Sequence, residues 1–93
     1  MIHHIVMFKV NNGVDPVELK TRLEALPPQI KVIRRFEVGI NSKDSPAAAH
    51  VVLLSSFDTH DDLATYANHP AHQEVVAYIK ANTTERRVVD YED

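Results

Sequence analysis

The sequence predicts an α+β fold of the ferredoxin-like type, in which a βαββαβ chain forms a four-stranded antiparallel sheet covered by helices on one face. Segments rich in β-branched residues and segments of helical periodicity follow one another in the order strand, helix, strand, strand, helix, strand. The chain has 93 residues and no low-complexity or repeated segment, so we expect a single domain over residues 1–93.

The composition of the chain excludes several classes of function. The formal net charge is −3, whereas binding to nucleic acid or to an anionic membrane requires a basic surplus. The absence of cysteine excludes a disulfide framework, a thiolate metal site and a cysteine nucleophile. No apolar run approaches the ~18 residues of a membrane span, and Met1 leads directly into a strand pattern rather than a signal peptide. We therefore expect a cytoplasmic protein with no nucleic-acid or membrane partner.

The first half of the chain predicts a strand, a helix and a second strand. Residues 2–10 are mostly β-branched or aromatic and contain no breaker, which is typical of a strand. Asp15 followed by Pro16 is a typical helix start, and the Pro-Pro pair after Leu26 ends the helix. Alternating apolar residues then predict the second strand over residues 29–41.

The second half predicts two strands on either side of a longer helix. Residues 49–57 are the most apolar stretch and predict the third strand. A helix begins after Thr59, and Pro70 either kinks it or breaks it and opens a new helical turn. Residues 85–92 predict a short last strand.

Both faces of the first and third strands are apolar, although the helices of this fold cover only one face of the sheet. In the first strand, Val6 and Phe8 lie on one face, and Ile5 and Met7 lie on the other. In a chain of this size the simplest cover for the second face is another copy of the same sheet. The sequence therefore predicts a homodimer formed through the sheet faces.

One helical segment is unusually rich in polar rings. Tyr66, His69 and His72 are separated by steps of three residues, each turning about 300°, so they share one broad stripe if the helix is continuous. His4 lies on the same strand face as Phe8. Imidazole titrates near neutrality and a phenol donates hydrogen bonds, so these side chains are candidates for acid–base chemistry.

Several segments together resemble a known family. HHIVMFK at the start, FEVGINS, LLSSF, YANHPAHQEVVAYI and the closing VVDYE are similar to the stress-responsive A/B barrel proteins, also called dimeric α+β barrel or Dabb proteins. The resemblance covers nearly the whole chain, and its most specific part is Tyr-x-x-His-Pro-x-His together with the N-terminal histidine. It implies a ferredoxin-like protomer whose sheet packs against that of its twin to form a barrel.

The resemblance also implies roles for individual residues. The family includes stress-induced plant proteins, plant polyketide cyclases of the olivetolic acid type and bacterial members. By similarity to the cyclases, His72, Tyr66 and His4 would be the catalytic residues of a pocket between helices and sheet. We also expect His69 and Phe8 to be ligand contacts. An imidazole would remove a proton next to a carbonyl and the phenol would stabilise the enolate, with no metal and no organic cofactor.

One departure from the cyclases concerns the first helix. The cyclases line their pocket with an aromatic residue from this helix, whereas residues 21–24 contain none. Arg22 is long and charged where the cyclases place a ring. A polyketide with an alkyl tail is therefore not the expected substrate, even if the pair of Tyr66 and His72 is retained.

Three interpretations of the histidines stay open, besides a cofactor-free monooxygenase activity that rests on fold analogy alone. In the first they bind a small organic ligand and act as a cyclase or lyase. In the second they are structural parts of a non-enzymatic stress or scaffold protein, with His69 capping the turn at Pro70 and His72 bonding a strand carbonyl. In the third, His69 and His72 bind a divalent metal with a recruited carboxylate such as Asp61 or Glu74.

Overall fold

The computed structural model describes all residues from Met1 to Asp93. In chain order the elements are β1 (Ile2–Val10), α1 (Pro16–Glu24), β2 (Arg35–Ile40), β3 (Val51–Phe57), α2 (His60–Asn68), α3 (Pro70–Asn82) and β4 (Thr83–Glu92). The strands form one antiparallel sheet in the order β2-β3-β1-β4. This is the ferredoxin-like arrangement, so the predicted α+β fold class is confirmed.

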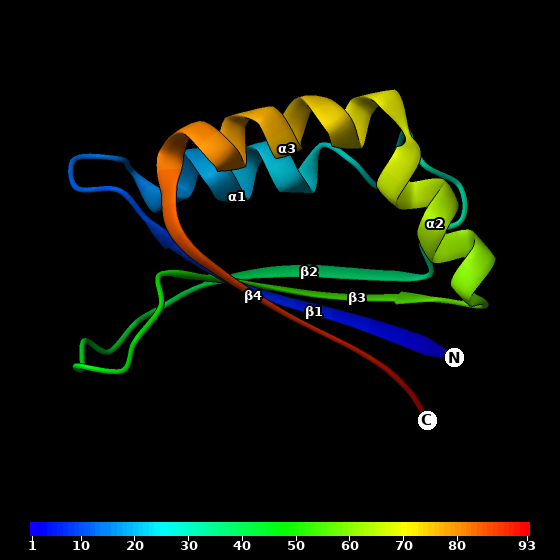
Figure 1. Ribbon diagram of the computed structural model, residues 1–93, viewed down its shortest axis with the longest axis horizontal. Coiled ribbons are helices and arrows are strands. Elements are labelled where there is room, and N and C mark those ends of the chain that lie inside the picture. Colours follow the sequence, from blue (N-terminus) through cyan, green and yellow to red (C-terminus); the bar gives the residue numbers. More distant parts are fainter.

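All of the helices lie on one face of the sheet, and the other face carries no element of the protomer (Figure 1). Alternate residues of the strands point toward the helices, because successive side chains of a strand point to opposite faces. These residues build the core together with apolar side chains of the helices, among them Val6, Phe8, Leu19, Leu23, Leu53, Phe57 and Ile79. No helix has the length and apolar character needed to span a lipid bilayer.

The edge strand β4 is exposed over almost its whole length, on both of its faces. The helices pack on β1, β2 and β3, and they leave the helix side of β4 uncovered. The core is therefore open along one side, between α3 and β4.

The long helix expected after Thr59 is broken at His69, as one of the two alternatives for Pro70 predicted. The backbone of His69 is extended (φ −65°, ψ 137°), so it ends α2 and begins α3. Its N–H donates to the carbonyl of Tyr66 at 3.2 Å, and its Nδ1 accepts from the N–H of Ala71 at 3.0 Å. Pro70 occupies the first helical position, where a missing N–H costs no intrahelical hydrogen bond. In Figure 1, α2 consequently turns away from α3 toward the end of the sheet.

The second strand is shorter than predicted, because residues 29–34 form turns. Gln29 N–H donates to the carbonyl of Leu26, and Ile33 N–H donates to the carbonyl of Ile30. The apolar residues of this segment belong to turns, and some of them are buried in the core; Ile30 is 2% exposed. Their spacing in the sequence resembles that of a strand although they do not form one. The other differences are small: α1 ends at Glu24 rather than near Leu26, β3 begins at 51 rather than 49, and β4 begins at 83 rather than 85.

Candidate functional site

A pocket of about 150 Å³ lies between the helices and the sheet, on the side where no helix covers β4. An apolar cavity of that size holds a molecule as large as benzene. Most of its lining residues are hydrophobic. The lining residues are His4, Val6, Phe8, Leu23, Leu53, Tyr66, His72, Val76, Ile79, Lys80 and Arg86.

The three side chains predicted to be catalytic meet in this pocket, although they come from three elements. The ring centroids of Tyr66 and His72 are 4.4 Å apart, and those of His4 and Tyr66 are 6.1 Å apart. The break at His69 does not separate Tyr66 on α2 from His72 on α3, since both rings still point toward the sheet side. Phe8 also lines the pocket and is buried at 2% exposure.

The hydrogen bond of His72 defines which of its ring nitrogens is available. Nδ1 lies 2.9 Å from the carbonyl oxygen of Ala67, and because a carbonyl only accepts, Nδ1 carries the proton. Burial lowers the pKa of His72 below its ordinary 6.5; the nearby His4 and Arg86 act in the same direction, and the bond to Ala67 opposes them. The neutral ring therefore presents an unprotonated Nε2, which is the atom that a general base uses. The carbonyl belongs to α2, not to a strand as one interpretation expected.

The hydroxyl of Tyr66 is the one buried side-chain polar atom without a hydrogen-bond partner. The residue is 1% exposed, and its ring also packs against Phe57 and Phe36. Burial raises the pKa of Tyr66 far above its usual range, although the charge of Arg86 acts in the opposite direction. The phenol thus stays protonated and offers one O–H. An unsatisfied buried hydroxyl costs about 1–3 kcal/mol, a cost that a ligand oxygen accepting this hydrogen bond would remove.

His4 is held by a carboxylate that the sequence did not identify as part of the site. Its Nδ1 is hydrogen-bonded to Oδ1 of Asp90, which lies directly opposite His4 in the pairing of β1 with β4. The carboxylate keeps a proton on Nδ1, so Nε2 is the nitrogen left for a ligand. The missed residues Asp90 and Arg86 share a strand face, four residues apart, and that spacing is the only signal of them in the sequence.

The similarity to known proteins covers the whole chain. The sequence pattern of the stress responsive A/B barrel domain (Dabb) matches residues 2–93. The chain belongs to this family. The resemblance predicted from the Tyr-x-x-His-Pro-x-His segment and the flanking strands is confirmed.

Two relatives and one solved structure show how this Dabb protein compares. An uncharacterized protein of Streptomyces coelicolor is 37% identical over an alignment of 97 positions, which covers 99% of each chain. A stress-response A/B barrel domain-containing protein of Arabidopsis thaliana is 33% identical over an alignment of 79 positions, which covers 82% of this chain but 30% of that longer protein. A dimeric ferredoxin-like protein from Bacteroides fragilis, known from a crystal structure, is 37% identical in sequence and has a TM-score of 0.82. The match covers 99% of this chain and 95% of that one.

More distant structures share the fold alone. A hydroxynitrile lyase from Passiflora edulis is 13% identical, with a TM-score of 0.85 over 97% of this chain and 90% of its own. An antibiotic biosynthesis monooxygenase is 16% identical, with a TM-score of 0.83 over 100% of this chain and 98% of its own. This fold therefore carries different chemistries, and the function of this Dabb protein has to be argued from its own side chains.

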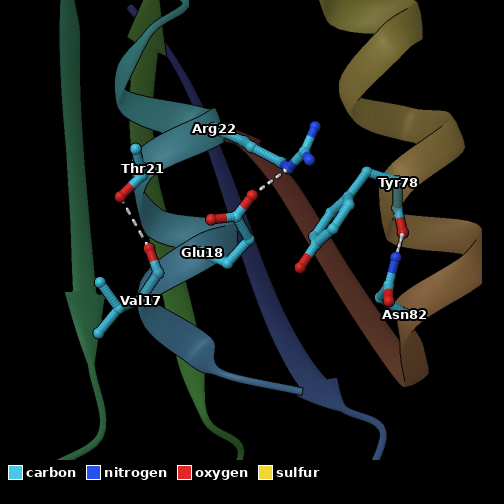
Figure 2. Close-up of polar contacts among 6 residues, drawn as sticks. All are labelled: Val17, Glu18, Thr21, Arg22, Tyr78 and Asn82. Carbon is cyan, nitrogen blue, oxygen red and sulfur yellow. Dashed lines mark hydrogen bonds and ion pairs between the residues drawn. The ribbon is translucent and has the colours of Figure 1, made fainter.

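The first helix of this Dabb protein contributes an aliphatic residue to the pocket, namely Leu23. Arg22 reaches from α1 toward α3 instead, as Figure 2 shows: its Nε donates to Glu18 at 2.9 Å, and its guanidinium lies 4.2 Å from the ring centroid of Tyr78 on α3. The arginine thus joins α1 to α3 and does not line the pocket. The structure therefore places no charge from the first helix in the pocket.

His69 does not line the pocket, in contrast to its predicted role as a ligand contact. Its Nδ1 accepts the N-cap hydrogen bond of α3, so this nitrogen is already used inside the protein. Nδ1 of His72 is likewise used by Ala67, and no group of three or more histidine and carboxylate side chains is placed to hold a metal ion. His69 and His72 therefore lack a third ligand, so the arrangement does not fit the metal interpretation.

Proposed function

We propose that this Dabb protein is a homodimer in which each protomer binds a small carbonyl compound and removes a proton from the carbon beside the carbonyl, without a cofactor. His72 acts as the base and Tyr66 as the hydrogen-bond donor to the oxygen. This is the first step of a cyclase or lyase reaction. The observation that carries the proposal is the buried Tyr66 hydroxyl, which has no hydrogen-bond partner, on a ring whose centroid lies 4.4 Å from that of His72.

The proposed step follows from the protonation states of the two groups. Nε2 of His72 takes the proton from the C–H bond, and the electron pair of that bond moves toward the carbonyl oxygen, which becomes an enolate. Tyr66 donates its O–H to this oxygen as the negative charge develops; one such donor contributes about 10²–10³ in rate. The imidazolium of His72 then returns a proton to the carbon. Alternatively, the enolate carbon attacks a second carbonyl, and the oxygen of that carbonyl takes up the proton from the imidazolium. His4 lines the same pocket, and its Nε2 is available to bond a second polar group of the ligand because Nδ1 is taken by Asp90.

The presence of an open pocket favours a ligand-binding protein over a scaffold with structural histidines. A scaffold would fill the space around Tyr66 and His72 with side chains, because protein interiors are close-packed. Here the two rings border about 150 Å³ of space that opens toward β4. The apolar part of the wall, including Phe8, suits the carbon skeleton of a ligand.

The homodimer is supported by the bare face of the sheet. On this face Ile5 lies between Leu54 and Val89 in the strand pairing, and Met7 lies beside Val52. Met7 is 47% and Val89 is 57% exposed in the protomer. Burying each such side chain contributes about 1.5–3 kcal/mol, and an isologous contact uses each of them twice. The B. fragilis relative, which is 37% identical, is described as dimeric.

Hydrogen–deuterium exchange of small ketones tests the chemistry directly. The protein is incubated with 2-pentanone in D₂O, and loss of the proton signal beside the carbonyl is followed by NMR. We expect acceleration by the wild type, a loss of about 10²–10⁴ in His72→Ala, and a loss of about 10²–10³ in Tyr66→Phe. Added imidazole should partly restore exchange in His72→Ala, because it fits the space that the ring leaves.

His60→Ala is the matched control, since it removes a solvent-exposed histidine at the start of α2. It should exchange protons like the wild type. Equal rates in wild type, His72→Ala and His60→Ala would contradict the proposal. A large loss of stability in His72→Ala without rescue by imidazole would instead favour the structural interpretation.

A further inference from the structure

Two cations at the pocket, Arg86 on β4 and Lys80 on α3, have no ion-pair partner in the protein. This distinguishes Arg86 from the three arginines outside β4. Those three each bind a carboxylate at 2.9–3.0 Å, in the pairs Arg22–Glu18, Arg34–Asp58 and Arg35–Glu37. The Arg86 guanidinium is not paired with a carboxylate of the protein, so it is free to bind the carboxylate of a ligand in the pocket.

The position of Arg86 connects it with the proposed reaction. In the pairing of β1 with β4, Arg86 lies opposite Phe8. Paired residues of neighbouring strands point to the same face of a sheet, so both side chains lie on the helix side. Burial is the main cause of the shifted pKa values of Tyr66 and His72, and the charge of Arg86 contributes to both of them. Arg86, Tyr66 and His72 all line the same pocket, so the guanidinium is placed to contact the same ligand as the phenol and the imidazole.

We propose that the ligand of this pocket is a small oxo acid, whose carboxylate is bound by Arg86 while its carbonyl oxygen accepts the hydrogen bond from Tyr66. The inference rests on the function proposed above and names the substrate class of the same site. Lys80 adds a second positive charge at the opening, and the guanidinium offers the planar pair of N–H groups that a carboxylate binds in bidentate fashion.

The size of the pocket limits the length of this acid. A cavity of about 150 Å³ holds roughly six non-hydrogen atoms of the size found in benzene. A chain of four or five carbons then fills the apolar part, with the carboxylate at the exposed guanidinium. The acid is correspondingly short, and the apolar wall around Phe8 and Leu53 contacts the carbons between its two polar ends.

Levulinate (4-oxopentanoate) and 2-pentanone form a matched pair of probes, because both are methyl ketones with a five-carbon chain and only the first has a carboxylate. Exchange of the protons beside the carbonyl is measured for both by NMR in D₂O. We expect wild-type protein to have at least a tenfold higher kcat/KM for levulinate. The ratio of the two values should fall about tenfold to a hundredfold in Arg86→Gln, since a hydrogen bond to a charged group contributes about 1.5–3 kcal/mol.

Two further variants separate the role of Arg86 from a general effect of charge. Arg86→Lys keeps the charge but loses the bidentate geometry, so it should restore part of the ratio. Lys43→Gln removes one positive charge from the exposed loop between β2 and β3 and should leave the ratio as in the wild type. An equal fall in Lys43→Gln and Arg86→Gln would overturn the assignment to Arg86.

The outcomes distinguish this inference from the function on which it rests. If exchange depends on His72 but the ratio survives Arg86→Gln, the carboxylate site is wrong and the proposed chemistry stands. If no ketone exchanges, but an NMR titration shows levulinate binding that weakens at least tenfold in Arg86→Gln, the chemistry is wrong and the carboxylate site stands. Absence of both effects overturns both. Preference for 2-oxopropylphosphonate over levulinate would overturn the choice of a carboxylate.

Discussion

His3 and His4 are neighbours in the sequence, but β1 directs them to opposite faces of the sheet. His4 is 8% exposed, lies under the helices and is hydrogen-bonded to Asp90. His3 lies on the bare face, where its ring nitrogens are 2.9 Å from Ser56 Oγ and 2.9 Å from a carboxylate oxygen of Asp93. Each ring thus contacts a carboxylate from the C-terminal end of the chain. The difference is that helices cover His4, whereas no element of the protomer covers His3.

This difference shows what a protomer can complete by itself. The helix-covered face contains the core, the pocket and its polar groups within one chain. The bare face presents a row of apolar residues, with Val89 and Tyr91 exposed at 57% and 48%, and it needs a second chain to remove them from water. The two faces should therefore respond differently to substitutions that are adjacent in sequence.

The largest effect is expected from a charge on the bare face. Val89→Glu places one carboxylate on each copy in the proposed dimer interface, and burying an unpaired charge costs several kcal/mol. We expect the dissociation constant to rise by at least a thousandfold, which sedimentation velocity would detect as a monomer at micromolar concentration. Val88→Glu is the control, because Val88 is 38% exposed on the helix side of the same strand. A dimeric Val89→Glu protein would show that this face is not the interface.

The second largest effect compares Leu53 and Leu54, which lie next to each other on opposite faces of β3. Leu53 is 1% exposed inside the core, so Leu53→Ala should lower the free energy of unfolding by about 2–5 kcal/mol. Leu54 is half-buried on the bare face, and Leu54→Ala should mainly weaken the dimer. Urea titrations at two protein concentrations separate these effects, because loss of dimer contacts depends on concentration. An equal loss in both variants, independent of concentration, would contradict the comparison.

The pH dependence of His72 gives an intermediate effect on the covered face. Its folded pKa lies below 6.5, mainly because of burial, so ketone exchange should be constant above that pH and fall about tenfold per unit below the folded pKa. Tyr66 remains protonated because burial raises its pKa, so no loss is expected on the alkaline side up to its ordinary pKa of 10.0. NMR exchange rates from pH 5 to pH 9 measure the profile.

The same shift has a consequence for stability, with a definite sign. As the pH falls through 6.5 the unfolded chain binds a proton at His72 before the folded protein does, so the folded protein loses stability until the pH reaches the lower folded pKa. His72→Asn should flatten this part of the stability curve, and His60→Asn should not. For the ketone-exchange profile described above, a midpoint above pH 6.5 would contradict the lowered pKa of His72.

The fold was predictable from the sequence because the signals for strands and for helix starts are local. The β-branched and apolar runs of β1 and β3 and the helix start signals at Asp15 and Thr59 can each be recognised from neighbouring residues. The approach of His4, Tyr66 and His72 was also predictable, from strand alternation and the family resemblance. The helical-spacing argument required a continuous helix, and the helix is broken at His69.

The contributions of Asp90 and Arg86 to the site were not predictable, because they depend on how β4 is aligned against β1. The alignment pairs His4 with Asp90 and Phe8 with Arg86. A shift of one residue would turn both β4 side chains to the bare face, and nothing local in the sequence determines that alignment. The prediction of a strand over residues 29–34 was wrong for a related reason: apolar residues that are buried but lie in turns have no sequence pattern of their own.

The smallest effect concerns His69, the sequence-predicted ligand contact that lies outside the pocket. Its Nδ1 accepts the N–H of Ala71, so His69→Ala should lower the free energy of unfolding by about 1 kcal/mol, the usual cost of losing an N-cap. His69→Asn should recover most of this loss, because asparagine is a favourable N-cap residue. Ketone exchange should stay within a few-fold of the wild type in both variants, in contrast to His72→Ala. Thermal unfolding and exchange rates on the same samples decide between the two roles: a loss of exchange in His69→Asn at unchanged stability would make His69 a ligand contact after all, reached by a movement at the break between α2 and α3.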